Sequence, residues 1–65
     1  MAVMNMALKA RIVYKFGSQS NFCEKAHERE SYVSRVINGR ETAPLIQQKK
    51  WARILKCEVS ELWPS

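Results

Sequence analysis

The side chains best suited to bind a metal ion are those of Cys23, His27 and Cys57. Cys23 and His27 are four residues apart, so on a helix they share a face and could bind zinc together with Cys57. Three ligands without a Cys-x-x-Cys pair match no recognised zinc spacing, and nothing signals the secretion that a disulfide would require. We therefore expect no metal site: the sequence favours two small apolar core cysteines and a histidine in a turn.

Catalytic groups are scarce in this chain. Nucleophilic or general acid–base catalysis needs a base with an orienting partner, but the sequence has a single histidine and no aspartate. A phosphate-binding loop needs clustered glycines, whereas Gly17 and Gly39 lie in different parts of the chain. The sequence therefore predicts a protein that is not an enzyme and that uses no cofactor or small-molecule substrate.

The composition is that of one small basic domain, residues 1–65. Eleven Lys and Arg residues against six Glu give a net charge of +5, which favours an anionic partner such as nucleic acid or a phospholipid surface. A basic charge that serves only solubility is the alternative. No apolar run is long enough to cross a bilayer and no secretory signal is recognisable, so we expect a cytoplasmic protein that does not enter membranes.

Apolar residues recur at helical spacing in five segments, and the two glycines offer few sites for hairpin turns. The residues expected to face the core are Leu8, Ile12, Phe16, Phe22, Cys23, Ala26, Val33, Val36, Ile37, Leu45, Ala52 and Leu55, with Trp51 and Ile54 alongside. The expected N-caps are Asn5, Ser18, Thr42 and Ser60, and the expected helix ends are Gly17 and Asn38-Gly39. The pattern predicts an all-α fold, a compact five-helix domain.

Residues 18–39 form the most informative segment. Two short helices joined by a three- or four-residue turn around His27 would pack their apolar residues together at a steep angle. This packing leaves a polar outer face on the second of the two helices. The residues of that face are Glu30, Ser31, Ser34, Arg35 and Asn38. The segment is therefore the place where we expect a partner to bind.

Three stretches of the chain match a known pattern: residues 17–22 (GSQSNF), residues 31–40 (SYVSRVINGR) and residues 51–62 (WARILKCEVSEL). On these stretches the sequence resembles the lambda-repressor-like helix-turn-helix family, of the Cro and xenobiotic-response-element type, over about residues 5–63. The turn departs from the family pattern. Its usual glycine is His27 here, and the apolar residue and the Ser or Thr cap that follow are Glu28 and Arg29. His27 must then adopt a left-handed conformation or reshape the turn.

The resemblance implies a helix-turn-helix formed by the second and third helices, and a third helix that enters the major groove of double-stranded DNA. The base-reading residues that it implies are Glu30, Ser31, Ser34 and Arg35. Among these, Arg35 is suited to a bidentate contact with guanine, and Glu30 can accept a hydrogen bond from the amino group of cytosine. The contacts to the DNA backbone that it implies come from Gln19, Tyr32, Asn38 and Arg40.

Several of these residues also have a purely structural interpretation. Arg35 would form a surface salt bridge with Glu28 or Glu24, and Tyr32 would cover the junction between the two helices. Gln19 and Asn38 would only cap their helices.

The function that the sequence favours is that of a sequence-specific transcriptional regulator, a Cro-like repressor from a phage, prophage or mobile element. One such domain makes few base contacts, so we expect a homodimer on a near-palindromic operator. The best candidates for a dimerisation patch are Leu62, Trp63 and the end of the fourth helix, while a Trp63 that only covers the core is the favoured alternative. The alternative function is a protein-interaction module on the same scaffold, an antirepressor or an antitoxin half, and Glu28 and Glu30 favour it.

Overall fold

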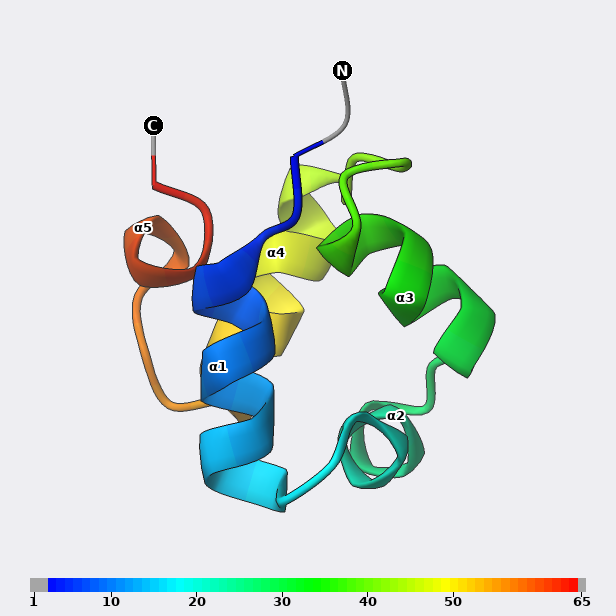
Figure 1. Ribbon diagram of the computed structural model, residues 1–65. Helices are drawn as coiled ribbons and strands as arrows, with labels where there is room; N and C mark the ends of the chain where they lie inside the picture. Colours follow the sequence, from blue (N-terminus) through cyan, green and yellow to red (C-terminus); the bar gives the residue numbers. More distant parts are fainter. Residues whose placement is uncertain (1–2, 65) are drawn as a thin grey trace.

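The computed structural model of the chain describes residues 3–64, so positions 1, 2 and 65 of the expected domain lie outside it (Figure 1). This range contains five helices and no strand. The helices are α1 (Met6–Phe16), α2 (Gln19–Ala26), α3 (Glu30–Ile37), α4 (Leu45–Ile54) and α5 (Val59–Leu62). The predicted all-α fold is thereby confirmed. α1 packs against α2, α3 and α5, and α5 also packs against α4.

The core is organised around the indole of Trp51 on α4, which is fully buried. Its ring centroid lies 5.5 Å from that of Phe22, 5.9 Å from that of Tyr32 and 6.1 Å from that of Trp63. The remaining core residues are Leu8, Ile12, Cys23, Ala26, Val33, Val36, Ile37, Ala43, Ala52, Leu55 and Leu62. Aromatic pairs contribute about 0.5–1.5 kcal/mol each beyond the burial of their area. Trp51 therefore ties together α2, α3 and the C-terminal segment.

The first two helices begin and end where the sequence predicts. The Oδ1 atom of Asn5 accepts the Leu8 N–H at 3.1 Å, and the Ser18 hydroxyl accepts the Asn21 N–H at 3.2 Å. Gly17 ends α1 with a φ of 80°, a left-handed conformation that costs glycine little. These caps are confirmed, and they fix the short connection between α1 and α2.

The start of α4 differs from the prediction. Thr42 does not cap this helix: Pro44 occupies the N-cap position, and α4 begins at Leu45. Leu45 was expected in the core, but its side chain is 59% exposed, whereas Ala43 in the preceding loop is 1% exposed. Ala43 thus takes the core position at this end of the helix. The Gln48 side chain secures the loop by donating a hydrogen bond to the Ala43 carbonyl at 2.9 Å.

Of the remaining predicted caps, that of α5 is wrong, whereas the expected end of α3 at Asn38-Gly39 is confirmed. α5 is capped by Glu58 rather than Ser60, because Glu58 and Glu61 form a reciprocal capping box in which the Glu61 side chain accepts the Glu58 N–H at 2.7 Å. At the end of α3, Asn38 keeps an ordinary φ of −80° and only Gly39 is left-handed, with a φ of 75°. A Cβ at Gly39 would also clash with the Val3 carbonyl oxygen.

The connection between α2 and α3 is the three-residue turn His27–Arg29, as expected. His27 adopts the left-handed conformation, with a φ of 57°, and the Glu28 N–H donates to the Cys23 carbonyl at 2.9 Å. The turn therefore keeps a tight geometry although it contains no glycine. The cost of this geometry is conformational strain, because His27 carries a side chain in the left-handed region.

Replacing His27 by glycine should stabilise the protein. The left-handed conformation costs a non-glycine residue about 1–2 kcal/mol, and the greater freedom of glycine in the unfolded chain offsets about 0.5–1 kcal/mol of that gain. We expect the free energy of unfolding, measured in urea, to rise for His27→Gly. Lys25→Gly, two residues earlier inside α2, should lower it by about 1 kcal/mol. Equal losses for both variants would contradict a left-handed His27.

Candidate nucleic-acid interface

The outer face of α3 brings the four expected base-reading residues together. Glu30, Ser31 and Arg35 are exposed and Ser34 is half-buried, all within the helix Glu30–Ile37. The opposite face of the helix is buried, and its residues are Val33, Val36 and Ile37. The outer face therefore presents a guanidinium, a carboxylate and two hydroxyls without apolar bulk, a set of groups able to read hydrogen-bonding partners.

Arg35 forms an ion pair with a partner that the sequence did not indicate. Its Nε donates to the Oε1 atom of Glu41 at 2.9 Å, and the two side chains are 49% and 41% exposed. The expected alternatives, Glu28 and Glu24, are therefore wrong as partners. Glu41 follows α3 in the loop before α4, where the chain turns back towards Arg35.

Glu28 occupies a nearly buried position in the turn, and its carboxylate is held from α4. Oε2 accepts the indole N–H of Trp51 at 3.1 Å and the ammonium of Lys50 at 3.2 Å, while the side chain is only 12% exposed. A buried carboxylate needs such partners to offset its loss of hydration. This contact explains how an acid is accommodated at a nearly buried position of the turn.

Tyr32 lies on the inner side of α3, half-buried against Trp51. Burial raises the pKa of its phenol, and the carboxylates of Glu41 and Glu28 raise the pKa further. The phenol is therefore neutral at physiological pH. Its place in the structure matches the interpretation that Tyr32 covers the junction between the helices.

The other expected backbone contacts lie at the ends of α2 and α3. Gln19 is the first residue of α2 and is half-buried, next to amides of the first turn that have no acceptor within the helix. Asn38 caps α3 through its backbone N–H, which donates to the Ser34 carbonyl at 2.9 Å. Its Nδ2 donates to the Ser34 hydroxyl at 3.2 Å and steadies this candidate reading residue. Arg40 is exposed, and its backbone N–H donates to the Arg35 carbonyl at 2.9 Å.

The thiols and the histidine are not arranged as a metal site in the part of the chain that the structure describes. Cys23 is 4% exposed and Cys57 is half-buried, whereas His27 is exposed in the turn. Burial raises the pKa of both thiols, which keeps them protonated and weakly nucleophilic at neutral pH. The expectation of two core cysteines is confirmed for Cys23 and holds in part for Cys57.

The positive charge of the chain is distributed unevenly. Residues 18–41 carry as many acidic as basic side chains, whereas α1 contains Lys9, Arg11 and Lys15 and no acid. On α4 a shallow depression of about 440 Å³ is lined by Ile46, Lys49, Lys50, Arg53 and Ile54. The excess positive charge therefore lies on α1 and α4, outside the segment that carries the candidate reading residues.

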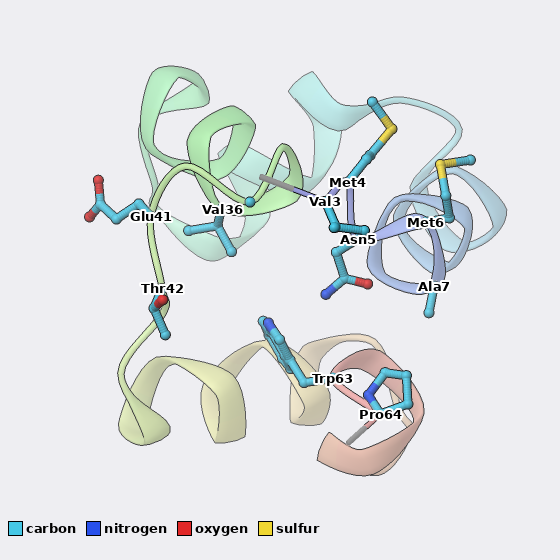
Figure 2. Close-up of a pocket in the computed structure, with 11 residues that line it drawn as sticks. Val3, Met4, Asn5, Met6, Ala7, Val36, Glu41, Thr42, Trp63 and Pro64 are labelled. Atoms are coloured by element: carbon cyan, nitrogen blue, oxygen red, sulfur yellow. The ribbon is translucent and has the colours of Figure 1, made fainter. Parts of the chain in front are cut away.

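A second hollow, of about 420 Å³, lies between the N-terminal residues, the loop after α3 and the C-terminal end of the chain (Figure 2). Trp63 and Pro64 form one side of it, and Val3, Met4 and Met6 line another. Trp63 is half-buried and rests on Trp51, which favours its role as a cover for the core. Leu62 is fully buried, so its expected place in an exposed patch is wrong.

Comparison of the chain with protein-family models, with curated proteins and with solved structures finds no match. Among residues 3–64, no helix combines the length and the hydropathy that crossing a membrane requires.

Removing the Glu28 carboxylate should destabilise the turn. Glu28→Ala leaves the indole N–H of Trp51 without an acceptor in a nearly buried place, which costs about 1–3 kcal/mol in the free energy of unfolding. Glu28→Gln keeps an oxygen acceptor and should cost less. The exposed Glu24 provides the control, since Glu24→Ala removes the same charge and should change stability by less than about 0.5 kcal/mol. Urea unfolding followed by tryptophan fluorescence measures all three, and equal effects at both positions would contradict the account.

Proposed function

We propose that this chain is a sequence-specific double-stranded DNA-binding regulator of the lambda-repressor-like helix-turn-helix type, acting as a Cro-like repressor. The observation that supports this function best is the polar outer face of α3, presented by two short helices and a three-residue turn. The face is rigidly supported, because Val33 and Val36 are buried behind it and Tyr32 packs on Trp51. A supported helix with hydrogen-bonding side chains on its outer face suits the major groove.

In this proposal α3 lies in the major groove with its N-terminal half nearest to the bases. The guanidinium of Arg35 donates to O6 and N7 of a guanine, and the carboxylate of Glu30 accepts from the amino group of a cytosine. Ser31 and Ser34 discriminate less, since a hydroxyl both donates and accepts. Arg35 therefore carries most of the sequence preference.

Phosphate contacts would fix α3 in the groove. Gln19 and the free amides of the first turn of α2 bind one phosphate, at the positive end of the helix dipole. Arg40 and Asn38 bind another, just beyond the end of α3. The lysines of α1 and α4 supply the long-range field that attracts DNA, since the reading segment itself is neutral.

A single α3 contacts few base pairs, so the proposed regulator acts as a homodimer on a near-palindromic operator. Two α3 helices related by a twofold axis would read half-sites about one helical turn of DNA apart. The cytoplasm of a bacterial host and a phage, prophage or mobile-element origin belong to the same proposal.

Two substitutions separate base reading from phosphate binding. Arg35→Ala should relax the preference at one base pair by about 1–3 kcal/mol, because a bidentate contact to guanine is lost. Gln19→Ala should weaken binding to all duplexes alike, because a phosphate contact carries no sequence information. Competition binding of each variant against a panel of single-base-pair operator variants measures both effects. An unchanged preference in Arg35→Ala would show that the proposed register of α3 is wrong.

The alternative function, a protein-interaction module, is favoured by the charges of residues 18–41, which carry no net charge and place Glu30 on the outer face of α3. The exposed side chains of Val13 and Tyr14 on α1 add apolar surface that a protein partner could cover.

The salt dependence of binding distinguishes the two functions. Binding to DNA should weaken by about 0.9 log units per contacted phosphate for each log unit of salt, because bound counterions are released. Affinity for a fixed duplex, measured by fluorescence anisotropy between low and physiological salt, gives this slope. A slope close to zero would favour a protein partner over DNA.

A further inference from the structure

Glu41 is held beside Arg35 by the backbone as well as by its side chain. The N–H groups of Arg40 and Glu41 donate to the Arg35 carbonyl at 2.9 and 3.3 Å, so the loop after α3 folds back over its last turn. From this loop the Glu41 carboxylate accepts the Nε–H of Arg35 at 2.9 Å. Figure 2 shows the Glu41 side chain pointing away from the Trp63 ring and out of the hollow. The fold of this loop therefore places the Glu41 carboxylate next to the guanidinium of Arg35.

Glu41 accepts from the Nε atom of Arg35, and this choice of atom determines which N–H groups of the guanidinium can still donate to a partner. A guanidinium has five N–H donors in a plane, and it can bind two acceptors either through its two Nη groups or through Nε and one Nη. Because Nε already donates to Glu41, the pair of Nη groups remains for a partner. The end of the guanidinium, rather than its side, is thus left to bind a partner.

We propose that Glu41 is a positioning residue that fixes the guanidinium of Arg35 for end-on reading of guanine. This inference rests on the proposed function. A guanidinium that is already fixed loses less rotamer freedom when it binds. Its two Nη groups match the two acceptors of guanine, O6 and N7, better than they match the groups of any other base. Glu41 thereby raises the preference for guanine at the base pair that Arg35 faces.

The negative charge of Glu41 also raises the preference for the right base pair. An arginine without a carboxylate partner binds phosphates at any sequence, and this sequence-independent attraction lowers discrimination. Glu41 opposes that attraction near the reading face and repels the DNA backbone. Its presence therefore lowers the affinity for all DNA and increases the difference between the right and the wrong base pair.

The test compares Glu41→Ala with Glu24→Ala, an exposed acid on α2 with no salt-bridge partner in the described part of the chain. Each protein is titrated with two duplexes that differ only in a G·C or A·T pair at the position where Arg35→Ala changes the preference. Both variants should bind DNA somewhat more tightly overall, because each loses a negative charge. Only Glu41→Ala should lower the ratio of the two affinities, by about two- to fivefold. Glu41→Gln, which keeps an oxygen acceptor, should retain most of the preference.

The double variant Arg35→Ala/Glu41→Ala completes the cycle, and its ratio should equal that of Arg35→Ala alone. If Glu41→Ala keeps the wild-type ratio while Arg35→Ala lowers it, the ion pair does not position the arginine and the inference is wrong, although the proposed function stands. If the wild-type protein prefers no duplex over another, the proposed function and the inference both fail.

Discussion

The burial of Trp51, with its indole N–H donated to Glu28, is the interaction on which the rest of the structure depends. The ring packs against Phe22 of α2 and Tyr32 of α3, and its nitrogen holds the turn between these helices through a carboxylate. A domain of this size buries little surface, so one large side chain that contacts several elements contributes a large share of its stability. The same contacts set the angle at which α3 presents its outer face.

Local signals in the sequence predicted the helices better than the contacts between them. Asn5, Ser18 and Gly17 cap their helices because their side chains or their conformational freedom act within one turn of the backbone. The contact between Glu28 and Trp51 joins residues far apart in sequence, so no periodicity could indicate it. Leu45 fits the apolar pattern of α4, yet Ala43 fills the core there, because packing rather than pattern decides which turn is buried. The α3 face was predictable from its polar residues, whereas the Glu41 partner of Arg35 depends on how the following loop folds.

The uneven charge distribution suggests how attraction and recognition can be divided in so small a chain. The lysines and arginines of α1 and α4 supply the positive excess, while the segment that contains α2 and α3 is neutral. In the proposed function the first set raises the affinity for any DNA and the second supplies the preference for a sequence. In that proposed function, an acid beside Arg35 lowers the affinity for DNA, and this would suit a regulator that must distinguish one site from a large excess of others.

Selection of bound duplexes from a random DNA library at moderate salt, followed by sequencing, tests the central claim most directly. The account predicts enrichment of an inverted repeat whose half-sites lie about one helical turn apart, each with a guanine at the position that Arg35 reads. A single enriched half-site would indicate a monomer on DNA and would contradict the dimer. No enrichment, with binding that disappears as salt rises, would contradict sequence-specific recognition and leave the protein-interaction module as the better function.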